Sequence, residues 1–544
     1  MSTTTAPVLP DAQRPRLAPG IEVHPPMGDG GSWVIQHGPR YIRVSASVAS
    51  LAQRLDGETT IDALAGSMGV PWTAELVTDA VGRFDALRLL DRGEQTPKKK
   101  QRSSRIKLVP PFTVQLTLLS PGRTMQALQP ALARWKGRRL AATSVVTALA
   151  GLVVLAVQAP YVTNLVSQPL SPLAYVGLLV GLIAGTSLHE LGHAFTLIRY
   201  GGRPSRIGIM LFYLMPTFFC DVSDSWRLAE RCQRVHVALA GPAVQTFLAG
   251  ASALAAWPLD VGGVKTCLVL FAVGSYITGL LNLLPLIKLD GYIALMSRVD
   301  IPYLRDRAIK DARRSVARLL FGGTYRRELP GRSWTVWYGL ACMTFPLYLL
   351  STALKLWIGL LQRAGFVGAC LAASAFCYVL YLVGRGIRRL VGEVRGSGAS
   401  RVRVTLVGAL LAAAASAVAF LPVTCTTPAA YVTRAGGVDV VLMRGSDASR
   451  IEPGRPVSLS TNGLILTPST GHGVIGQQGG KRTTAPVSAF FPIALGPEPE
   501  TPVISYRLTT SQAPTEPFGT AEVDTGRLPL WEVAYRTYVA PFIP

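Results

Sequence analysis

Seven long apolar segments constrain the fold of this chain more than any other feature. A helix needs about 20 apolar residues to cross roughly 30 Å of hydrocarbon. Of all residues, 49% are hydrophobic and only 16% are charged, whereas an average soluble domain carries roughly 25% charge. The sequence therefore predicts a polytopic α-helical membrane protein with about seven transmembrane helices, near residues 140–158, 173–198, 235–257, 265–288, 334–354, 364–384 and 402–421.

The basic residues predict the orientation of these spans. Lys and Arg total 54 against 31 Asp and Glu, a net charge of +23. They concentrate in alternate loops such as 298–332 and 385–403, whereas the loop 159–172 carries no charge. The positive-inside bias then predicts a cytoplasmic N-terminus and, after seven spans, an extracytoplasmic C-terminus. Topology thus explains the charge excess, and we expect no nucleic-acid partner. The first 20 residues lack an apolar core, so we expect the first span itself to direct insertion.

Composition divides the rest of the chain. Residues 1–23 are rich in Pro, Thr and Ala and are predicted to be a disordered tail. Residues 24–93 combine an extended segment with helical patterns typical of a small winged-helix-like domain. Residues 94–136 are predicted to be a basic linker, attracted to lipid headgroups, followed by an interfacial helix. Residues 422–544 are rich in Gly, Pro, Thr and Val with short alternating segments, which predicts a β-rich extracytoplasmic domain.

Two histidines and a glutamate lie inside the second predicted span. In the segment HELGHA, His189 and His193 are four residues apart and therefore share one face of a helix. This spacing lets two imidazoles bind one zinc ion, and Glu190 is the residue that acts as general base in such sites. Ionisable groups inside an apolar span are costly and usually functional. We expect a site for one zinc ion here; the alternative is a polar cluster that only joins helices.

A further ligand is expected from the fourth apolar segment, which ends in NLLPLIKLDGYIAL. Together with HELGHA, this segment resembles the site-2 protease family of intramembrane zinc metallopeptidases, with a catalytic core over residues 137–300. The resemblance implies that Asp290 completes the zinc site, that Asn282 lines the substrate groove or helps to hold the scissile carbonyl, and that Gly291 supports them. It also implies a bacterial plasma membrane. Taken alone, the LDG segment could be a helix-terminating turn.

Further supporting residues follow from the same resemblance. The region 207–226 resembles the re-entrant β-loop and acidic segment of bacterial peptide zinc metalloproteases, and such a strand edge could hold a substrate extended. Asp221 and Asp224 are candidate supporting acids, although Asp224 could equally be a helix N-cap. His236 is a candidate supporting residue near the start of the third span; the alternative is an interfacial histidine that reaches toward water.

The segment LDGETTIDALA, residues 55–65, resembles the PqqD-like domains that bind leader segments of ribosomally made peptides. This implies that residues 24–93 bind a precursor leader; the alternative is a cytosolic helical cap without a ligand. The sequence thus predicts a zinc endopeptidase that cleaves a peptide or membrane-protein substrate near the cytoplasmic face and matures a ribosomal precursor. Residues 301–421 are then a basic cytoplasmic loop and additional spans. The alternatives are a peptide export or immunity protein that only binds peptide, and a metal transporter.

Overall fold

The computed structural model describes most of the chain, in two compact units that we describe separately. One unit comprises residues 1–148, 182–248 and 275–302, and the other comprises residues 149–181, 249–274 and 303–544. The described residues, to which every structural statement here refers, are 14–26, 33–37, 40–91, 106–109, 113–119, 127–134, 136–212, 215–363, 365–443, 451–496, 498–510 and 514–539.

The N-terminal module is a three-stranded antiparallel sheet with three short helices. Each helix begins at a hydroxyl residue, Ser45, Thr60 or Thr73, whose side chain accepts a hydrogen bond from a backbone N–H in the first turn; this is the preferred type of N-cap. Its winged-helix class stays a prediction. The elements are β1 (Ile21–His24), β2 (Trp33–His37), β3 (Arg40–Val44), α1 (Ala46–Gln53), α2 (Ile61–Met68) and α3 (Ala74–Ala86).

The predicted disordered tail, residues 1–23, is wrong for its last ten residues; residues 1–13 lie outside the described part. Leu17 packs against the core of the module, and its backbone N–H donates to Leu55 C=O at 3.1 Å. Ala18 N–H donates to Leu89 C=O at 2.9 Å. Ile21 and Val23 of β1 also pack against this core and pair with β2. These contacts order a segment whose composition alone indicated disorder.

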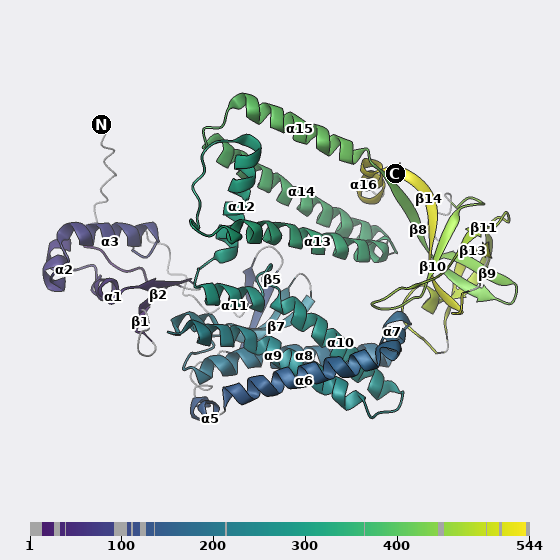
Figure 1. Cartoon of the computed structure of the whole chain (residues 1–544), viewed down its shortest axis with the longest axis horizontal. Helices are drawn as coiled ribbons and strands as arrows, with labels where there is room; N and C mark the ends of the chain where they lie inside the picture. Colours follow the sequence, from purple (N-terminus) through teal and green to yellow (C-terminus); the bar gives the residue numbers. More distant parts are fainter. Residues whose placement is uncertain are drawn as a thin grey trace. The chain divides into compact units, whose positions relative to one another are not determined.

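Six helices of the described residues are long and apolar enough to cross a membrane (Figure 1). The remaining predicted span, 334–354, lies in α13 (Trp334–Arg363), a 30-residue helix that is not one of these six. Seven spans therefore stay a prediction. The six are α6 (Gly137–Val157), α8 (Pro172–Arg199), α9 (Arg231–Ala256), α10 (Gly263–Leu283), residues 367–395 of α14 (Gly365–Arg395) and α15 (Arg401–Ala419).

The predicted β-loop at 207–219 is an antiparallel hairpin that belongs to a larger sheet. Its strands β6 (Ile207–Phe212) and β7 (Met215–Cys220) extend a sheet of order β4-β5-β6-β7. The first two strands, β4 (Ile106–Val109) and β5 (Thr113–Leu119), lie where we predicted only a linker and an interfacial helix. That prediction is wrong for these residues: β5 pairs with β6, and β4 pairs with β5. Both segments are rich in β-branched residues and leucine, which favour strands. Between residues 127 and 134 the structure has one short helix, α5 (Gln129–Ala133).

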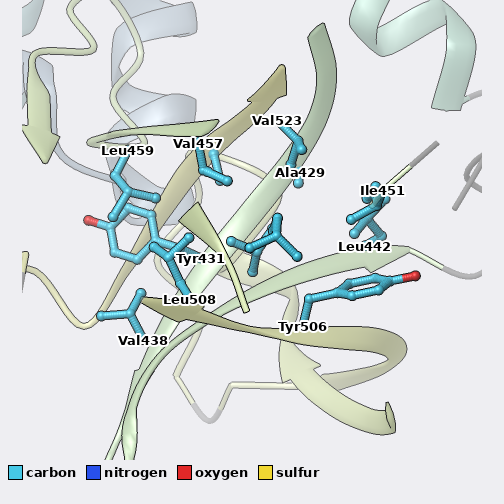
Figure 2. Close-up of a cluster of buried hydrophobic side chains, with 13 residues drawn as sticks. Ala429, Tyr431, Val438, Leu442, Ile451, Val457, Leu459, Tyr506, Leu508 and Val523 are labelled. Atoms are coloured by element: carbon cyan, nitrogen blue, oxygen red, sulfur yellow. The ribbon is translucent and has the colours of Figure 1, made fainter. Parts of the chain in front are cut away.

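The C-terminal domain is β-rich, as predicted. Its strands follow the order β11-β10-β14-β8-β9-β13-β12, and a further pairing of β11 with β13 closes six of them into a ring. Apolar side chains such as Tyr431, Leu459 and Val523 fill the interior (Figure 2). The strands are β8 (Pro422–Arg434), β9 (Gly437–Met443), β10 (Pro456–Ser460), β11 (Ser469–Ile475), β12 (Lys481–Pro486), β13 (Glu500–Thr510) and β14 (Phe518–Pro529).

Six further helices complete the described chain. A basic helix follows the region of the predicted ligands, and a last helix follows the β-domain. These helices are α7 (Ala159–Ser167), η1 (Ser223–Arg227), α11 (Asp290–Val299), α12 (Leu304–Phe321), η3 (Val487–Ala489) and α16 (Leu530–Tyr538).

Candidate metal centre

Helix α8 presents its two histidines on one face. The ring centroids of His189 and His193 are 4.9 Å apart in an edge-to-face arrangement. Both side chains are buried, with exposed fractions of 5% and 4% for the residues. Two buried imidazoles one helical turn apart need a compensating charge or ion, since burying polar groups without a partner is costly.

Asp290 reaches this pair because the chain turns sharply after α10. Helix α10 ends at Leu283, two residues before Pro285, and α11 begins at Asp290 itself. Its carboxylate thus lies in the first turn of a helix, where negative charge is stabilised. A Cβ at Gly291 would lie only 2.0 Å from Leu283 O. Only glycine therefore lets α11 pack this closely against the end of α10. Gly291 thus supports the site by leaving room for the backbone of Leu283.

The three side chains meet at distances that suit one metal ion. Asp290 Oδ2 lies 3.0 Å from His189 Nε2, and Oδ1 lies 3.3 Å from His193 Nε2. The two Nε2 atoms are 3.2 Å apart. Tetrahedral zinc with ligands at about 2.0–2.1 Å separates its ligand atoms by about 3.3–3.4 Å. The two imidazoles and the carboxylate can therefore occupy three corners of such a site, and two imidazoles with one carboxylate form a donor set of catalytic zinc centres.

A backbone carbonyl orients one of the imidazoles. His193 Nδ1 donates to Val237 C=O at 2.7 Å. A carbonyl only accepts, so the proton is on Nδ1, and Nε2 of the neutral ring offers its lone pair to a metal. Sequence reasoning indicated the neighbouring His236 instead. His236 is exposed and hydrogen-bonds Tyr200 at 2.8 Å, so the structure does not bring it into the cluster. A backbone acceptor leaves no residue-type signal, and Val237 was missed for that reason.

Helix α9 contacts both imidazoles through the backbone of a glycine, Gly241. A Cβ at Gly241 would lie 2.3 Å from His193 Nε2 and 2.5 Å from His189 Nε2. On the facing helix, a Cβ at Gly192 would lie 2.9 Å from Val244 Cγ2. These two glycines allow α8 and α9 to approach closely, as small residues do in membrane helix pairs.

Glu190 is held by the hairpin. Its Oε2 accepts a hydrogen bond from the backbone N–H of Cys220, the last residue of β7, at 2.8 Å. The next residue, Asp221, donates its N–H to Arg206 C=O at 2.8 Å, on the side of β6. Because successive N–H groups of a strand point to opposite sides, the N–H of Cys220 points away from β6. Glu190 thus lies at the outer edge of the hairpin.

Asp221 supports the hairpin and does not join the metal cluster. It accepts hydrogen bonds from the backbone N–H and the hydroxyl of Ser223, at 3.2 and 2.6 Å, and from Arg206 at 3.2 Å. Burial raises the pKa of Asp221, but hydrogen bonds from Ser223, Ser205 and Arg206 outweigh it and leave this pKa below its ordinary value of 3.8. The carboxylate therefore stabilises the connection between β7 and α9.

This lowered pKa predicts a pH-dependent contribution to stability. A carboxyl whose pKa is lower in the folded state stabilises the protein above its unfolded pKa, and this stabilisation is lost as the pH falls through the folded value. The melting temperature of Asp221→Asn should therefore fall below that of the original chain near pH 7, and the difference should shrink below about pH 4. A difference that stayed constant down to pH 3 would argue against this origin.

Asp224 is likewise structural. It is 8% exposed, and it accepts hydrogen bonds from Arg203 N–H at 2.8 Å and from Arg227 at 3.1 Å. The N-cap of η1 is Val222, so the alternative that Asp224 is an N-cap is wrong. Its carboxylate lies one residue inside the helix and is used by the preceding segment instead.

Asn282 lies in the last turn of α10, one residue before the helix ends. It is half-buried, and its side chain makes no hydrogen bond to another described residue. A substrate-binding role therefore stays a prediction, which the position next to the turn that carries Asp290 permits.

The far end of α11 is anchored by Asp300. This residue has a left-handed backbone with φ of 57°. Its Oδ1 accepts hydrogen bonds from Arg234 of α9 at 2.8 Å and from Arg43 at 2.9 Å. Arg234 is only 2% exposed. The ion pair therefore ties α11, which begins with Asp290, to the helix that carries Gly241.

Asp300→Asn is expected to lower the free energy of unfolding by up to about 3 kcal/mol, because it leaves the buried guanidinium of Arg234 without a charge partner. The melting temperature in detergent measures this. The matched control is Asp79→Asn, whose pair with Arg83 is 58% and 76% exposed and should contribute almost nothing. Equal melting temperatures for the two variants would contradict the anchoring role.

The comparisons with known proteins show a distant similarity. The chain is 34% identical over 162 residues to the "Putative zinc metalloprotease Rip2" of Mycobacterium tuberculosis, in the strains Erdman and H37Rv alike. The match covers 24% of this chain and 62% of that relative. No protein-family model matches, and no solved structure does. In part of its length, this membrane-helix chain is therefore similar to a protein described as a zinc metalloprotease.

Proposed function

We propose that this chain is a membrane-embedded zinc endopeptidase of the site-2 protease type. The observation that carries the proposal is the meeting of His189, His193 and Asp290, whose ligand atoms lie 3.0–3.3 Å apart. Glu190, in the same helix turn as the histidines, supplies the general base. The similarity to a zinc metalloprotease supports zinc as the metal.

The residues divide the chemistry in a simple way. A zinc ion held by the three ligands would supply Lewis acidity, which lowers the pKa of water and polarises a carbonyl. Glu190 accepts the proton of the attacking water and returns it to the nitrogen of the departing amine. Asn282 is the candidate for holding the scissile carbonyl, since an amide N–H₂ donates to a carbonyl oxygen.

The hairpin suggests how a substrate is held. A peptide bond inside a helix is shielded, so a substrate must be extended where it is cut. In the described part of the sheet, β7 pairs on one side with β6, and its other side faces Glu190 through Cys220 N–H. A substrate segment added along this side would be extended and would pass next to the general base. This supports an endopeptidase acting on peptide segments.

Contacts of the C-terminal domain support a seven-span topology. Leu170, just before α8, donates its N–H to Pro492 of this domain at 3.0 Å, and the domain itself directly follows α15. The start of α8 and the end of α15 then lie on one side of the membrane. From that side, α8, α9 and α10 make three crossings, so residue 283 and the start of α15 both lie on the opposite side. An even number of crossings must separate them, so α13 crosses together with α14.

The distribution of basic residues orients this topology. With the basic loops inside, the N-terminal module and the end of α10 are cytoplasmic, and the β-domain is extracytoplasmic. The site then lies toward the cytoplasmic end of α8, ten residues or fewer before Arg199. We propose a bacterial plasma membrane as the location. Residues 24–93 would bind the leader of a ribosomally synthesised precursor, which makes peptide maturation the proposed role.

Mass spectrometry that identifies new peptide ends tests the proposal, with the purified chain in lipid nanodiscs. Incubated with a library of membrane-derived and precursor peptides, the chain should generate new peptide ends. Chelation of the metal should abolish them, and added zinc should restore them. Binding of a peptide that persists without zinc and without new ends would instead indicate the export or immunity alternative.

A further inference from the structure

Three consecutive large apolar side chains are exposed on the C-terminal domain. Leu464, Ile465 and Leu466, here called the apolar loop, join β10 to β11 and are 37%, 47% and 45% exposed. Exposed apolar surface of this kind is unfavourable in water and usually marks a contact surface. The apolar loop therefore needs a partner.

The backbone of the apolar loop is held in place. The N–H groups of Ile465 and Leu466 both donate to Val166 C=O at 3.2 Å. A Cβ at Gly463 would lie 2.6 Å from Ser167 Cα, so the two backbones touch. Asn462, 5% exposed, donates its Nδ2 to Ser488 C=O at 2.7 Å. The exposure of the three side chains is thus built into the fold.

The position of Val166 shows which surface the apolar loop faces. Val166 lies in the last turn of α7, in the short connection between two helices suited to crossing a membrane. The first of these, α6, ends at Val157, and the second, α8, begins at Pro172. A connection of this length must lie at the membrane surface, and the apolar loop is hydrogen-bonded to it. Its side chains are therefore at the level of the lipid.

A second group of exposed apolar side chains lies next to the end of α15, another helix suited to crossing a membrane. Leu530, the first residue of α16, donates its N–H to Leu421 C=O at 3.0 Å, two residues beyond the end of α15. At a rotation of about 100° per residue, Leu530, Trp531 and Tyr535 lie on one side of α16, and they are 40%, 48% and 43% exposed. Trp and Tyr prefer the membrane interface. The ion pair of Glu532 with Arg536 lies on another side of the helix.

We propose that the C-terminal β-domain binds the lipid surface through the apolar loop and α16. The two groups are far apart in sequence, belong to one domain, and each is hydrogen-bonded to the end of a membrane-suited helix or to the connection between two. Together they seat the domain on the bilayer at the start of α8, the helix that carries His189 and His193. The proposal is independent of the proposed catalytic activity.

Fluorescence quenching by lipid tests whether the apolar loop and α16 contact the bilayer. An environment-sensitive fluorescent amino acid is incorporated at position 465 of the full chain, which is then reconstituted in liposomes whose acyl chains carry bromine. The control is position 478, which is exposed beyond the other end of β11, roughly 20 Å along a strand of this length. We expect severalfold quenching at position 465 and none at position 478, with position 531 behaving like 465.

Two results would overturn the proposal. If position 465 gives the same intensity in brominated and ordinary lipid, the apolar loop does not reach the acyl chains. If positions 465 and 478 are quenched equally, the whole domain contacts lipid without a specific seat. The melting temperature of each labelled chain, compared with that of the original chain, reports whether it has folded, so a failed preparation is recognised and replaced by labelling at Leu464 or Leu466.

Discussion

Glu190→Gln is expected to slow peptide hydrolysis by about 10²–10⁴-fold, the usual contribution of a positioned general base. The amide has nearly the shape of the carboxylate, and its oxygen can still accept the hydrogen bond from Cys220 N–H. It cannot take a proton from water. The measurement is the rate of appearance of new peptide ends for the two purified chains, together with their zinc content, which should be equal.

The matched control for this substitution is Glu230→Gln. Glu230 is exposed just before α9, and its carboxylate accepts from the thiol of Cys232 rather than from the hairpin. This variant should cleave at the original rate. If Glu190→Gln hydrolysed peptide at the original rate, Glu190 would not be the general base. If the same variant lost its zinc, Glu190 would support the metal site rather than the reaction.

Gly241→Ala is expected to weaken metal binding by about 10–100-fold, the range typical of groups that orient metal ligands. The added methyl group would lie within 2.5 Å of both Nε2 atoms. The imidazoles must move, and His193 can move only by giving up its hydrogen bond to Val237. A competition titration with a zinc-binding dye measures the change in affinity.

A glycine in open surroundings provides the control for the added methyl group itself. A Cβ at Gly408 of α15 would meet no atom within 4 Å. Gly408→Ala should therefore keep the original zinc affinity and gain slightly in helix stability. If Gly241→Ala also kept the original affinity, the close packing of α9 against the ligands would not hold in solution.

The sequence predicted the residues of the candidate site better than their surroundings. The i, i+4 spacing of His189 and His193 depends only on helix geometry, and the structure places both rings together. Asp290 was inferred from a family resemblance, and the structure brings it to the same point. The reason is visible only in three dimensions, where Gly291 lets α11 fold back against Leu283.

The supporting residues could not be derived in this way. His236, Asp221 and Asp224 have the right chemical types, but their partners are Tyr200, Ser223 and Arg203 rather than the metal cluster. Tyr200 and Arg203 follow the end of α8, and Ser223 is the first residue of η1. Val237 contributes through its backbone, which any residue type could supply. Position along the chain does not reveal such contacts, since they depend on how α8, α9 and the hairpin pack.

The fold shows the same division between local and long-range information. Long apolar segments and short alternating segments each have a local signature, so the six helices that could cross a membrane and the β-rich C-terminal domain were predictable. Strands β4 and β5 were missed because the pairing of β5 with β6, which adds both to the sheet, joins residues about 95 positions apart in the chain. Closure of the C-terminal ring by β11 and β13 is equally non-local.

The metal content of the purified chain tests the central claim most directly. Elemental analysis after gel filtration should find one zinc ion per original chain and per Asp224→Asn chain, and almost none in His193→Ala or Asp290→Ala. A zinc content of Asp290→Ala equal to that of the original chain would contradict the joint ligation of one ion by α8 and α11.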